Sequence, residues 1–228
     1  MATAVEPRTR SAFECERRFL LPGVGWEGYE ALLDMIGDGH TRVTYDRGDA
    51  ELMSPSNKHD EYAELIGRII IAVTENLRVP CRALRSTTWR KFAVEGGLEA
   101  DNSYYVTNVP RVRGRRILDL AVDPPPDLAV EIEISHSALN RLRVYAGLRV
   151  PEVWRFDGEQ LVIHRLQPDG QYATRNDSLE IPAITADEIV HWTREGEAED
   201  NHTEWALRLR DWIQEELFPR YAERRENL

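Results

Sequence analysis

The sequence predicts an α/β or α+β fold in which helices flank a mixed central sheet. Segments with helical periodicity alternate with segments that show the two-residue alternation of strands, in the order helix, strands, helix, strands. The 228 residues, 42% of them hydrophobic and 30% charged, are enough for one sizeable core. We therefore expect a flexible tail over residues 1–12 and a single main domain over residues 13–192.

The N-terminal half is predicted to hold two helices with a pair of strands between them. Apolar residues recur at helical spacing over residues 27–37, and Gly37 is expected to end this first helix. Two short strands lie on either side of the turn at residues 47–49. The Ser-Pro-Ser-Asn stretch at residues 54–57 then offers an N-cap for the longest helix. The apolar residues of that helix recur at helical spacing: Tyr62, Leu65, Ile66, Ile69, Val73 and Leu77.

The C-terminal half is predicted to be richer in strands. Strand-like stretches at residues 82–94, 99–109 and 124–135 precede a helix that Ser137 can cap and that runs to about Leu148. The Asp-Gly pairs at residues 157–158 and 169–170 predict hairpins with tight turns after that helix. The remaining residues, 193–228, are expected to form an acidic linker and a terminal amphipathic helix. Its apolar stripe contains Trp205, Leu209, Trp212 and Ile213.

The composition excludes several classes of protein. A formal net charge of −11 leaves no overall basic field of the kind that coats nucleic acid. Two cysteines are too few for a disulfide framework or a structural zinc site. We find no apolar run with the length of a signal peptide or a membrane span, so the chain is expected to be cytoplasmic.

Two glutamates mark the strand-like stretch at residues 124–135. Because side chains alternate along a strand, Glu131 and Glu133 should share one face, roughly 7 Å apart at a rise of about 3.3 Å per residue. Two like charges this close in a half-buried sheet repel each other unless a positive group lies beside them. On spacing alone, a strand with one solvated face explains the pair better than a binding site does.

Asp101 lies thirty positions before Glu131, on a predicted neighbouring strand. Carboxylates that converge from adjacent strands are typical ligands of Mg²⁺, which binds one or two carboxylates together with waters and substrate phosphate. A metal held there would supply the missing positive charge and could assist hydrolysis of a phosphodiester.

Several motifs in order resemble the Uma-two family, a large bacterial family of unknown function. They are ELMSPSNKHDEYAELIG, EADNSYYV, PPPDLAVEIEIS and SALNRLRVYAGLRVPEVWRFDG, and the resemblance covers about residues 40–185. The family is assigned to the PD-(D/E)XK nuclease superfamily. The resemblance therefore implies a restriction-endonuclease-like fold, here with added C-terminal β-hairpins and a terminal helix.

The resemblance also implies roles for individual residues. Asp101 corresponds to the aspartate of the "PD" element, although Ala100 precedes it where the motif has proline. Glu131 takes the "(D/E)" place, and Glu133 stands where the lysine of the motif usually stands. In this family the lysine often lies on the following helix instead, and Arg141 fills that slot. An arginine stays protonated, so it can clamp a phosphate but cannot act as a base.

Two further residues of the first motif are candidates for the site. Glu51 lies on the strand before the long helix and His59 lies at the start of that helix, so both could be aimed at the same cleft. His59 could shuttle a proton or orient a group near the metal.

The leading interpretation is an endonuclease that depends on Mg²⁺ or Mn²⁺ and hydrolyses phosphodiester bonds of DNA. Asp101 and Glu131 would bind the metal, and Glu133 and Arg141 would complete the site. The terminal helix could also bury against a second copy of the chain and form a homodimer. One alternative is a nuclease fold that has lost its chemistry and binds nucleic acid or protein, which Arg141 and the charge of −11 favour. Another is a metal-buffering or purely structural interaction protein.

Overall fold

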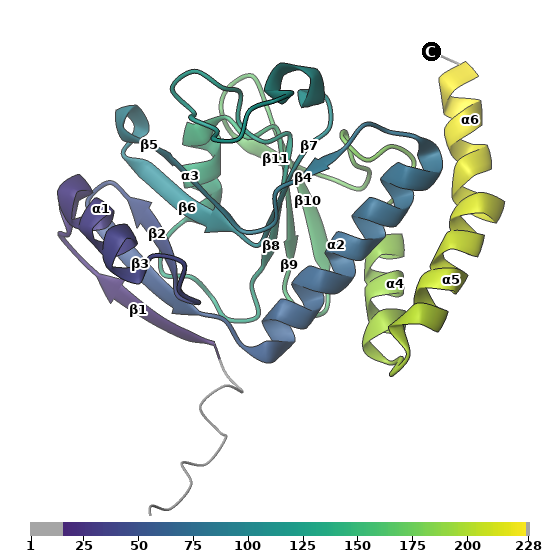
Figure 1. Cartoon of the computed structure of the whole chain (residues 1–228), viewed down its shortest axis with the longest axis horizontal. Helices are drawn as coiled ribbons and strands as arrows, with labels where there is room; N and C mark the ends of the chain where they lie inside the picture. The colour runs from purple at the N-terminus through teal and green to yellow at the C-terminus, as the bar shows by residue number, and fades with distance from the viewer. Residues whose placement is uncertain (1–15, 227–228) are drawn as a thin grey trace, which may run out of the picture.

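The chain folds into two β-sheets with helices packed on them (Figure 1), and the computed structural model describes residues 16–226. This arrangement confirms the prediction of a mixed α/β fold. It divides the strands between two sheets, whereas the sequence predicted one central sheet. The tail predicted at residues 1–12 lies outside the described residues.

The five-stranded sheet comes from the N-terminal half of the chain. Its strand order is β1-β3-β2-β6-β5, and every neighbouring pair is antiparallel. Helix α1 (Gly25–Ile36) packs on one face, where Tyr29 lies in a small core with Val43 and Tyr45. Gly37 ends this helix at a φ of 54°, as predicted. The strands are β1 (Arg17–Leu21), β2 (Arg42–Asp46), β3 (Asp49–Ser54), β5 (Thr87–Lys91) and β6 (Gly96–Ala100).

The six-stranded sheet is mixed, with the order β11-β10-β9-β8-β7-β4. Strands β8 and β9 are parallel and are connected through helix α3 (Arg141–Leu148), whereas the other pairs are antiparallel. The turns at residues 157–158 and 169–170 join β9 to β10 and β10 to β11, as predicted. The strands are β4 (Arg82–Ala83), β7 (Asn102–Tyr105), β8 (Leu128–Ile132), β9 (Glu152–Phe156), β10 (Leu161–Leu166) and β11 (Tyr172–Arg175).

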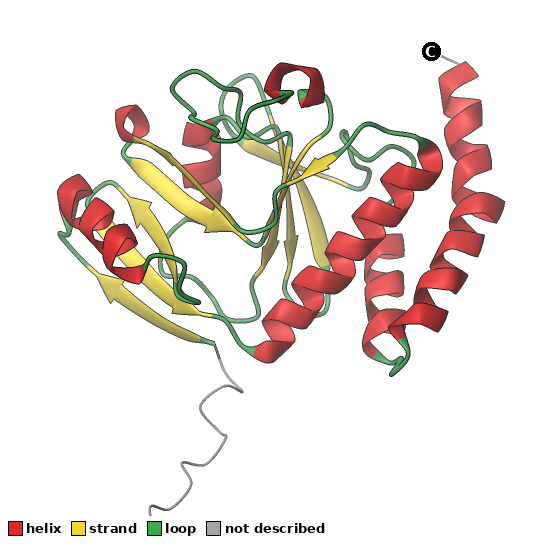
Figure 2. Cartoon of the chain, viewed as in Figure 1, coloured by secondary structure: helices red, strands yellow, loops and turns green. Residues whose placement is uncertain are grey.

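Helix α2 (Asn57–Leu77) forms the main core with one face of the six-stranded sheet (Figure 2). Ser56 caps the helix as predicted, since its hydroxyl accepts a hydrogen bond from the backbone N–H of His59 at 3.2 Å. The apolar stripe read from the sequence is buried here against Leu128, Val130 and Ile132 of β8. These residues alternate with Ala129, which lies in a second core that also contains Val144 and Tyr145 of α3. Glu131 shares the face of Ala129 and therefore points toward α3.

The C-terminal segment differs from the prediction because the acidic stretch is not simply a linker. Residues 194–197 belong to helix α4 (Ala186–Glu197), which begins with a capping box made by Thr185 and Glu188. The connection to the next helix spans only residues 198–201. The prediction was wrong because the charged residues occupy the outer side of a helix whose inner side carries Ile189 and Trp192.

The terminal helix is interrupted but continuous in direction. Helix α5 (His202–Trp212) leads through the π-helical turn η4 (Ile213–Leu217) into α6 (Phe218–Glu226). Trp205 is fully buried in the main core beside α2, and its indole N–H donates to the carbonyl of Trp192 at 2.9 Å. The apolar stripe of this helix, for which the sequence also allowed contact with a second copy of the chain, therefore packs within the chain.

Two corrections concern the segments that carry the candidate site. The helix expected from Ser137 begins at Arg141, because the side chain of Asn140 caps it by accepting the N–H of Arg143 at 3.1 Å. Asp101, expected on a strand, occupies the single position between β6 and β7. It therefore marks the point where the chain passes from one sheet to the other. The structure also contains the 3-10 turns η2 (Phe92–Val94) and η3 (Val109–Val112).

Candidate active site

The candidate site lies where the two sheets meet at Asp101. Strands β2 and β3 contribute residues from one sheet and β8 from the other, and α2 and α3 add residues near their N-termini. Four predicted residues are almost completely buried here, with exposed fractions of 5% or less: Glu51, His59, Asp101 and Glu131.

Asp101 is hydrogen-bonded to the backbone of β8, and its carboxylate also faces Arg42 and His59. Its Oδ2 accepts a hydrogen bond from the backbone N–H of Ile132 at 2.6 Å, and its own N–H donates to the carbonyl of Val130 at 3.2 Å. Its Oδ1 forms an ion pair with Arg42 and lies 3.3 Å from Nε2 of His59. The carboxylate position is therefore set by β8, β2 and α2 together.

The carboxylate of Glu131 interacts with two side chains of α3, Arg141 and Tyr145. Nη2 of Arg141 lies 2.7 Å from each carboxylate oxygen, and the hydroxyl of Tyr145 donates to Oε1. Arg141 also donates to the hydroxyl of Thr44 and, at 2.9 Å, to the carbonyl of Glu99. Burial alone would lower the pKa of Arg141, but the adjacent Glu131 carboxylate raises that pKa above its usual value. Arg141 is therefore a permanent cation that ties β8 to the five-stranded sheet.

Glu51 and Glu133 lie on either side of this centre. Glu51 accepts hydrogen bonds from Arg18 at 2.9 Å, from the hydroxyl of Ser137 at 2.7 Å and from the N–H of Ala138 at 2.6 Å. Glu133 is more exposed, at 13% of its side chain, and its Oε2 lies 2.6 Å from Nε of Arg155. Both carboxylates therefore interact chiefly with loop or strand neighbours rather than with Asp101.

Each of the four predicted carboxylates has an arginine of its own. Arg141 pairs with Glu131, and the arginine beside Glu133 is Arg155, so the glutamate pair does not share one cation. The sequence raised the question of which positive group offsets the repulsion between Glu131 and Glu133. The structure shows that each of these carboxylates has an arginine beside it. The pairs are Arg18–Glu51, Arg42–Asp101, Arg141–Glu131 and Arg155–Glu133.

His59 is fully buried and lies between acidic groups. Its Nε2 lies 3.3 Å from Oδ1 of Asp101 and 3.7 Å from Oε1 of Glu16. Burial is the main reason that its pKa falls to about 3, and the nearby guanidinium groups of Arg42 and Arg18 lower the pKa further. The imidazole is therefore neutral at pH 7, with one N–H to donate and one nitrogen lone pair to share.

Sequence reasoning predicted Arg141 but missed Tyr145 and the other three arginine partners, which are Arg18, Arg42 and Arg155. For Arg42 a signal was present, because Val43 and Tyr45 of β2 are buried toward α1 while Arg42, Thr44 and Asp46 alternate with them. Thr44 also lies directly opposite Glu51 in the β2–β3 register. For Arg18 and Glu16 the sequence offered no comparable signal, because both come from the first described residues, far from the motifs.

A cleft of about 410 Å³ opens beside the buried cluster, between β8, β9 and α3. The open space reaches Glu131, Arg141 and Tyr145 in its interior and Arg155 at a more exposed position. The cleft thus gives a ligand access to one carboxylate of the buried cluster and to two guanidinium groups.

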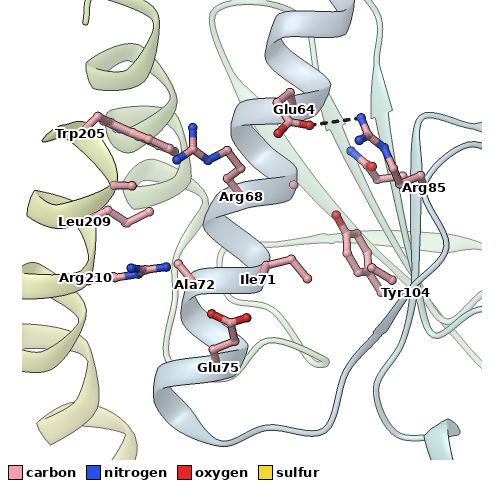
Figure 3. A pocket seen from close by; sticks show the side chains of 14 residues that line it. Glu64, Arg68, Ile71, Ala72, Glu75, Arg85, Tyr104, Trp205, Leu209 and Arg210 are labelled. Carbon is pink, nitrogen blue, oxygen red and sulfur yellow. Dashed lines mark hydrogen bonds and ion pairs between the residues drawn. The ribbon is translucent and has the colours of Figure 1, made fainter. Parts of the chain in front are cut away.

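A second hollow, of about 330 Å³, lies on the other side of the six-stranded sheet, along α2, with α5 on one side of that helix and β4 and β7 on the other (Figure 3). Tyr104, Trp205 and Leu209 line it, and the ion pair of Glu64 with Arg85, at 3.1 Å, lies at its edge. None of the predicted site residues lines this hollow. The cleft beside Glu131 is therefore the candidate active site.

The donor atoms at the site suit a hard divalent cation only in part. Within residues 16–226, no three or more His, Cys, Asp or Glu side chains are arranged to hold a metal ion. Two carboxylates with waters would suffice for Mg²⁺. Among the described residues, three buried polar atoms around this point lack a hydrogen-bond partner, although the first of them forms the ion pair with Arg42: Asp101 Oδ1, His59 Nε2 and Glu16 Oε1. The donor set fits Mg²⁺ or Mn²⁺, provided that the guanidinium groups on the carboxylates can move.

Comparison with known proteins gives the family. Residues 26–195 match the Uma2 family, which is described as "Putative restriction endonuclease". This chain belongs to the Uma2 family. The Uma2 match includes Asp101, Glu131 and Arg141 and ends within α4, so Arg18 and the terminal helices lie outside it. The resemblance drawn from the sequence motifs is thereby confirmed.

The chain also resembles a solved structure. No curated protein matches the chain. One similar solved structure is the crystal structure of a "putative nuclease belonging to DUF820" from Anabaena variabilis ATCC 29413, at 15% sequence identity and a TM-score of 0.44. The alignment covers 66% of this chain and 90% of that one. Among the described residues of the Uma2 chain, no helix has the length and apolar character needed to cross a membrane.

Proposed function

We propose that this Uma2-family chain is an endonuclease that uses Mg²⁺ or Mn²⁺ to hydrolyse phosphodiester bonds of DNA at the cleft beside Glu131. One observation carries the proposal. The residues that the family resemblance assigns to the site come from distant parts of the chain, yet they form one buried polar cluster next to a cleft. The description of the family, "Putative restriction endonuclease", supports the same reaction class.

Asp101 and Glu131 are the residues that would hold the cation. When bound, the cation would lower the pKa of a water molecule and offset charge on the phosphate. His59, neutral and 3.3 Å from Asp101, would keep that carboxylate oriented. Since its pKa lies near 3, His59 is a poor proton acceptor and its contribution is positional.

Arg141 is the residue suited to the phosphate itself. It lines the cleft and presents a planar group that matches two phosphate oxygens. Because it stays protonated, it stabilises negative charge on the phosphate and cannot activate water as a lysine could. Water activation is then left to the metal and the carboxylates.

Nucleic acid would be attracted locally rather than by the whole protein. The net charge is −11, but Arg155 is 40% exposed and His136 is 94% exposed at the same cleft. A few phosphate contacts of this kind give modest affinity that weakens as salt is added.

The experiment is a cleavage assay with a matched control. We would incubate the purified chain with supercoiled plasmid and with labelled single-stranded and duplex DNA, in Mg²⁺, Mn²⁺ or a chelator. Cleavage is expected from the wild type and from Glu64→Gln, which removes a 48%-exposed carboxylate at the second hollow. It should be lost in Glu131→Gln. A wild type that leaves every substrate intact with both metals would overturn the proposal.

A second candidate is a nuclease fold that binds nucleic acid without cutting it. The specific observation in its favour is that both candidate metal ligands are already paired with an arginine. Arg42 pairs with Asp101, and Arg141, the residue in the lysine slot, pairs with Glu131. This version predicts DNA binding that weakens with salt, no turnover, and no change on replacing Glu131 by glutamine.

A further inference from the structure

Arginines cover the two carboxylates assigned to the metal. Arg42 reaches Asp101 from β2, and Arg141 reaches Glu131 from α3. The arginine side chains are only 11% and 10% exposed, so they are parts of the interior and not surface charges that happen to lie nearby.

Each of these arginines also contacts a second group near the same centre. Arg42 lies 3.9 Å from the carboxylate of Glu99, whose backbone carbonyl accepts the hydrogen bond from Arg141. The two cations therefore meet at Glu99 and balance the charges of Asp101 and Glu131 without any metal. Mg²⁺ requires carboxylate oxygens with free lone pairs in near-octahedral geometry, so a carboxylate in contact with a guanidinium is a poor ligand.

A phosphate is the natural competitor for these guanidinium groups. Arginine binds phosphate through two parallel hydrogen bonds as readily as it binds carboxylate. Arg141 lies both on Glu131 and in the wall of the cleft, so a phosphate that enters the cleft can draw it away from the carboxylate.

We propose that Arg42 and Arg141 occupy the place of the cation in the substrate-free protein, and that a nucleic-acid phosphate must displace Arg141 from Glu131 before the divalent metal can bind. This inference rests on the proposed function, because it describes how that same site is loaded. Metal and nucleic acid then bind cooperatively, and by linkage each raises the affinity of the other by the same factor. Couplings of this type are typically about 5-fold to 150-fold.

The test measures Mn²⁺ binding alone, by calorimetry on the full chain. The wild type should bind Mn²⁺ weakly, and Arg42→Gln should bind it at least about 5-fold more tightly, within the usual range for such coupling. The matched control is Arg143→Gln. Arg143 forms an ion pair with Asp46, which is also buried at 5% exposure, but Asp46 is not a candidate ligand. This control should bind Mn²⁺ no better than the wild type.

Three results would overturn the inference: tight Mn²⁺ binding by the wild type, no gain in Arg42→Gln, or an equal gain in the Arg143→Gln control. Arg141→Lys is the second variant, in case Arg42→Gln does not fold. A lysine keeps the charge but lacks the planar fork, so Mn²⁺ should again bind more tightly than in the wild type.

A second arm measures the coupling directly. Free Mn²⁺ is followed by electron paramagnetic resonance with the wild type, with and without a short DNA duplex, after subtracting the Mn²⁺ that the duplex binds by itself. The duplex should increase the affinity for Mn²⁺, and an unchanged affinity would contradict the inference. Neither experiment measures DNA cleavage. A protein that never cuts DNA could therefore still show the displacement of arginine by phosphate, and an active nuclease could lack it.

Discussion

Arg141 places one guanidinium nitrogen, Nη2, 2.7 Å from both carboxylate oxygens of Glu131. This contact links the start of α3 to β8, and the other bonds of Arg141 continue to Thr44 and Glu99 of the five-stranded sheet. A buried ion pair of this kind contributes to stability only when its remaining donors and acceptors are satisfied, as they are here. The residue in the lysine slot is therefore a structural junction as well as a candidate for phosphate binding.

Removing Arg141 should destabilise the fold strongly. Arg141→Ala leaves the buried carboxylate of Glu131 without its cation, and breaking such a pair costs about 3–5 kcal/mol. Arg155→Ala is the comparison, because Arg155 is 40% exposed beside Glu133 and an exposed pair is worth about 0–1 kcal/mol. Urea unfolding of both variants measures the difference. Equal losses would mean that Glu131 remains solvated in the native state.

His59 should make the protein sensitive to acid. Its pKa is about 3 in the folded chain, and an exposed histidine titrates near 6.5. Because the unfolded chain binds the extra proton over that interval, the free energy of unfolding should fall as the pH drops from about 6.5 toward 3. Thermal unfolding of the wild type and of His59→Asn as a function of pH tests this. The wild type should show the steeper loss of stability, and parallel curves would contradict the assignment.

Glu180 should have the opposite dependence at higher pH. Burial, together with the charges of Asp127 and Glu152, raises the pKa of Glu180 to about 7 in the folded chain, against a usual value of 4.5. The folded state then holds a proton that the unfolded state has lost, so stability should decrease as the pH rises from about 4.5 through 7. Glu180→Gln should raise the melting temperature at pH 8 and have little effect at pH 5. A benefit of equal size at both pH values would show that titration of Glu180 is not responsible.

The chemistry of Arg141 can be separated from its structural role by comparing two substitutions. Arg141→Lys keeps a cation at the cleft and should retain metal-dependent cleavage of DNA. Arg141→Gln removes the charge, and the loss of one positioned donor to a developing negative charge should lower the cleavage rate by about 100-fold. Assays would use protein shown by circular dichroism to be folded. If the lysine and glutamine variants cut equally well, Arg141 does not contact the phosphate.

Local patterns were enough to predict most of the elements. The helical stripe of α2, the cap at Ser56 and the two Asp-Gly hairpins depend on residues close together in the chain, so periodicity and turn chemistry identified them. The acidic stretch at residues 194–201 was misassigned because charge suggested a linker. The buried residues Ile189 and Trp192 favour a helix that includes residues 194–197.

The sequence predicted the carboxylates of the candidate site together with His59 and Arg141, but not the other arginines. Alternation in β8 placed Glu131 on the face away from α2, the position of Asp101 on a predicted neighbouring strand indicated a second carboxylate, and the family resemblance added Arg141. The cations that neutralise the other carboxylates lie on strands whose pairing joins residues far apart in sequence. Arg42 and Asp101 illustrate this, since only the meeting of the two sheets brings them together.

Gly196 lies one residue beyond the family match and touches both sides of the main core. A Cβ atom at this position would lie 2.6 Å from a side-chain carbon of Leu65 and 3.0 Å from the indole of Trp205, so only glycine lets α4 and α5 approach α2 this closely. The residues that match the family therefore end before the packing of α5 on α2 begins. A chain shortened to end at residue 195 would keep every motif residue but would lose Trp205 and Leu209. The apolar residues of α2 that these side chains cover would then be exposed to water, and we expect such a chain to self-associate.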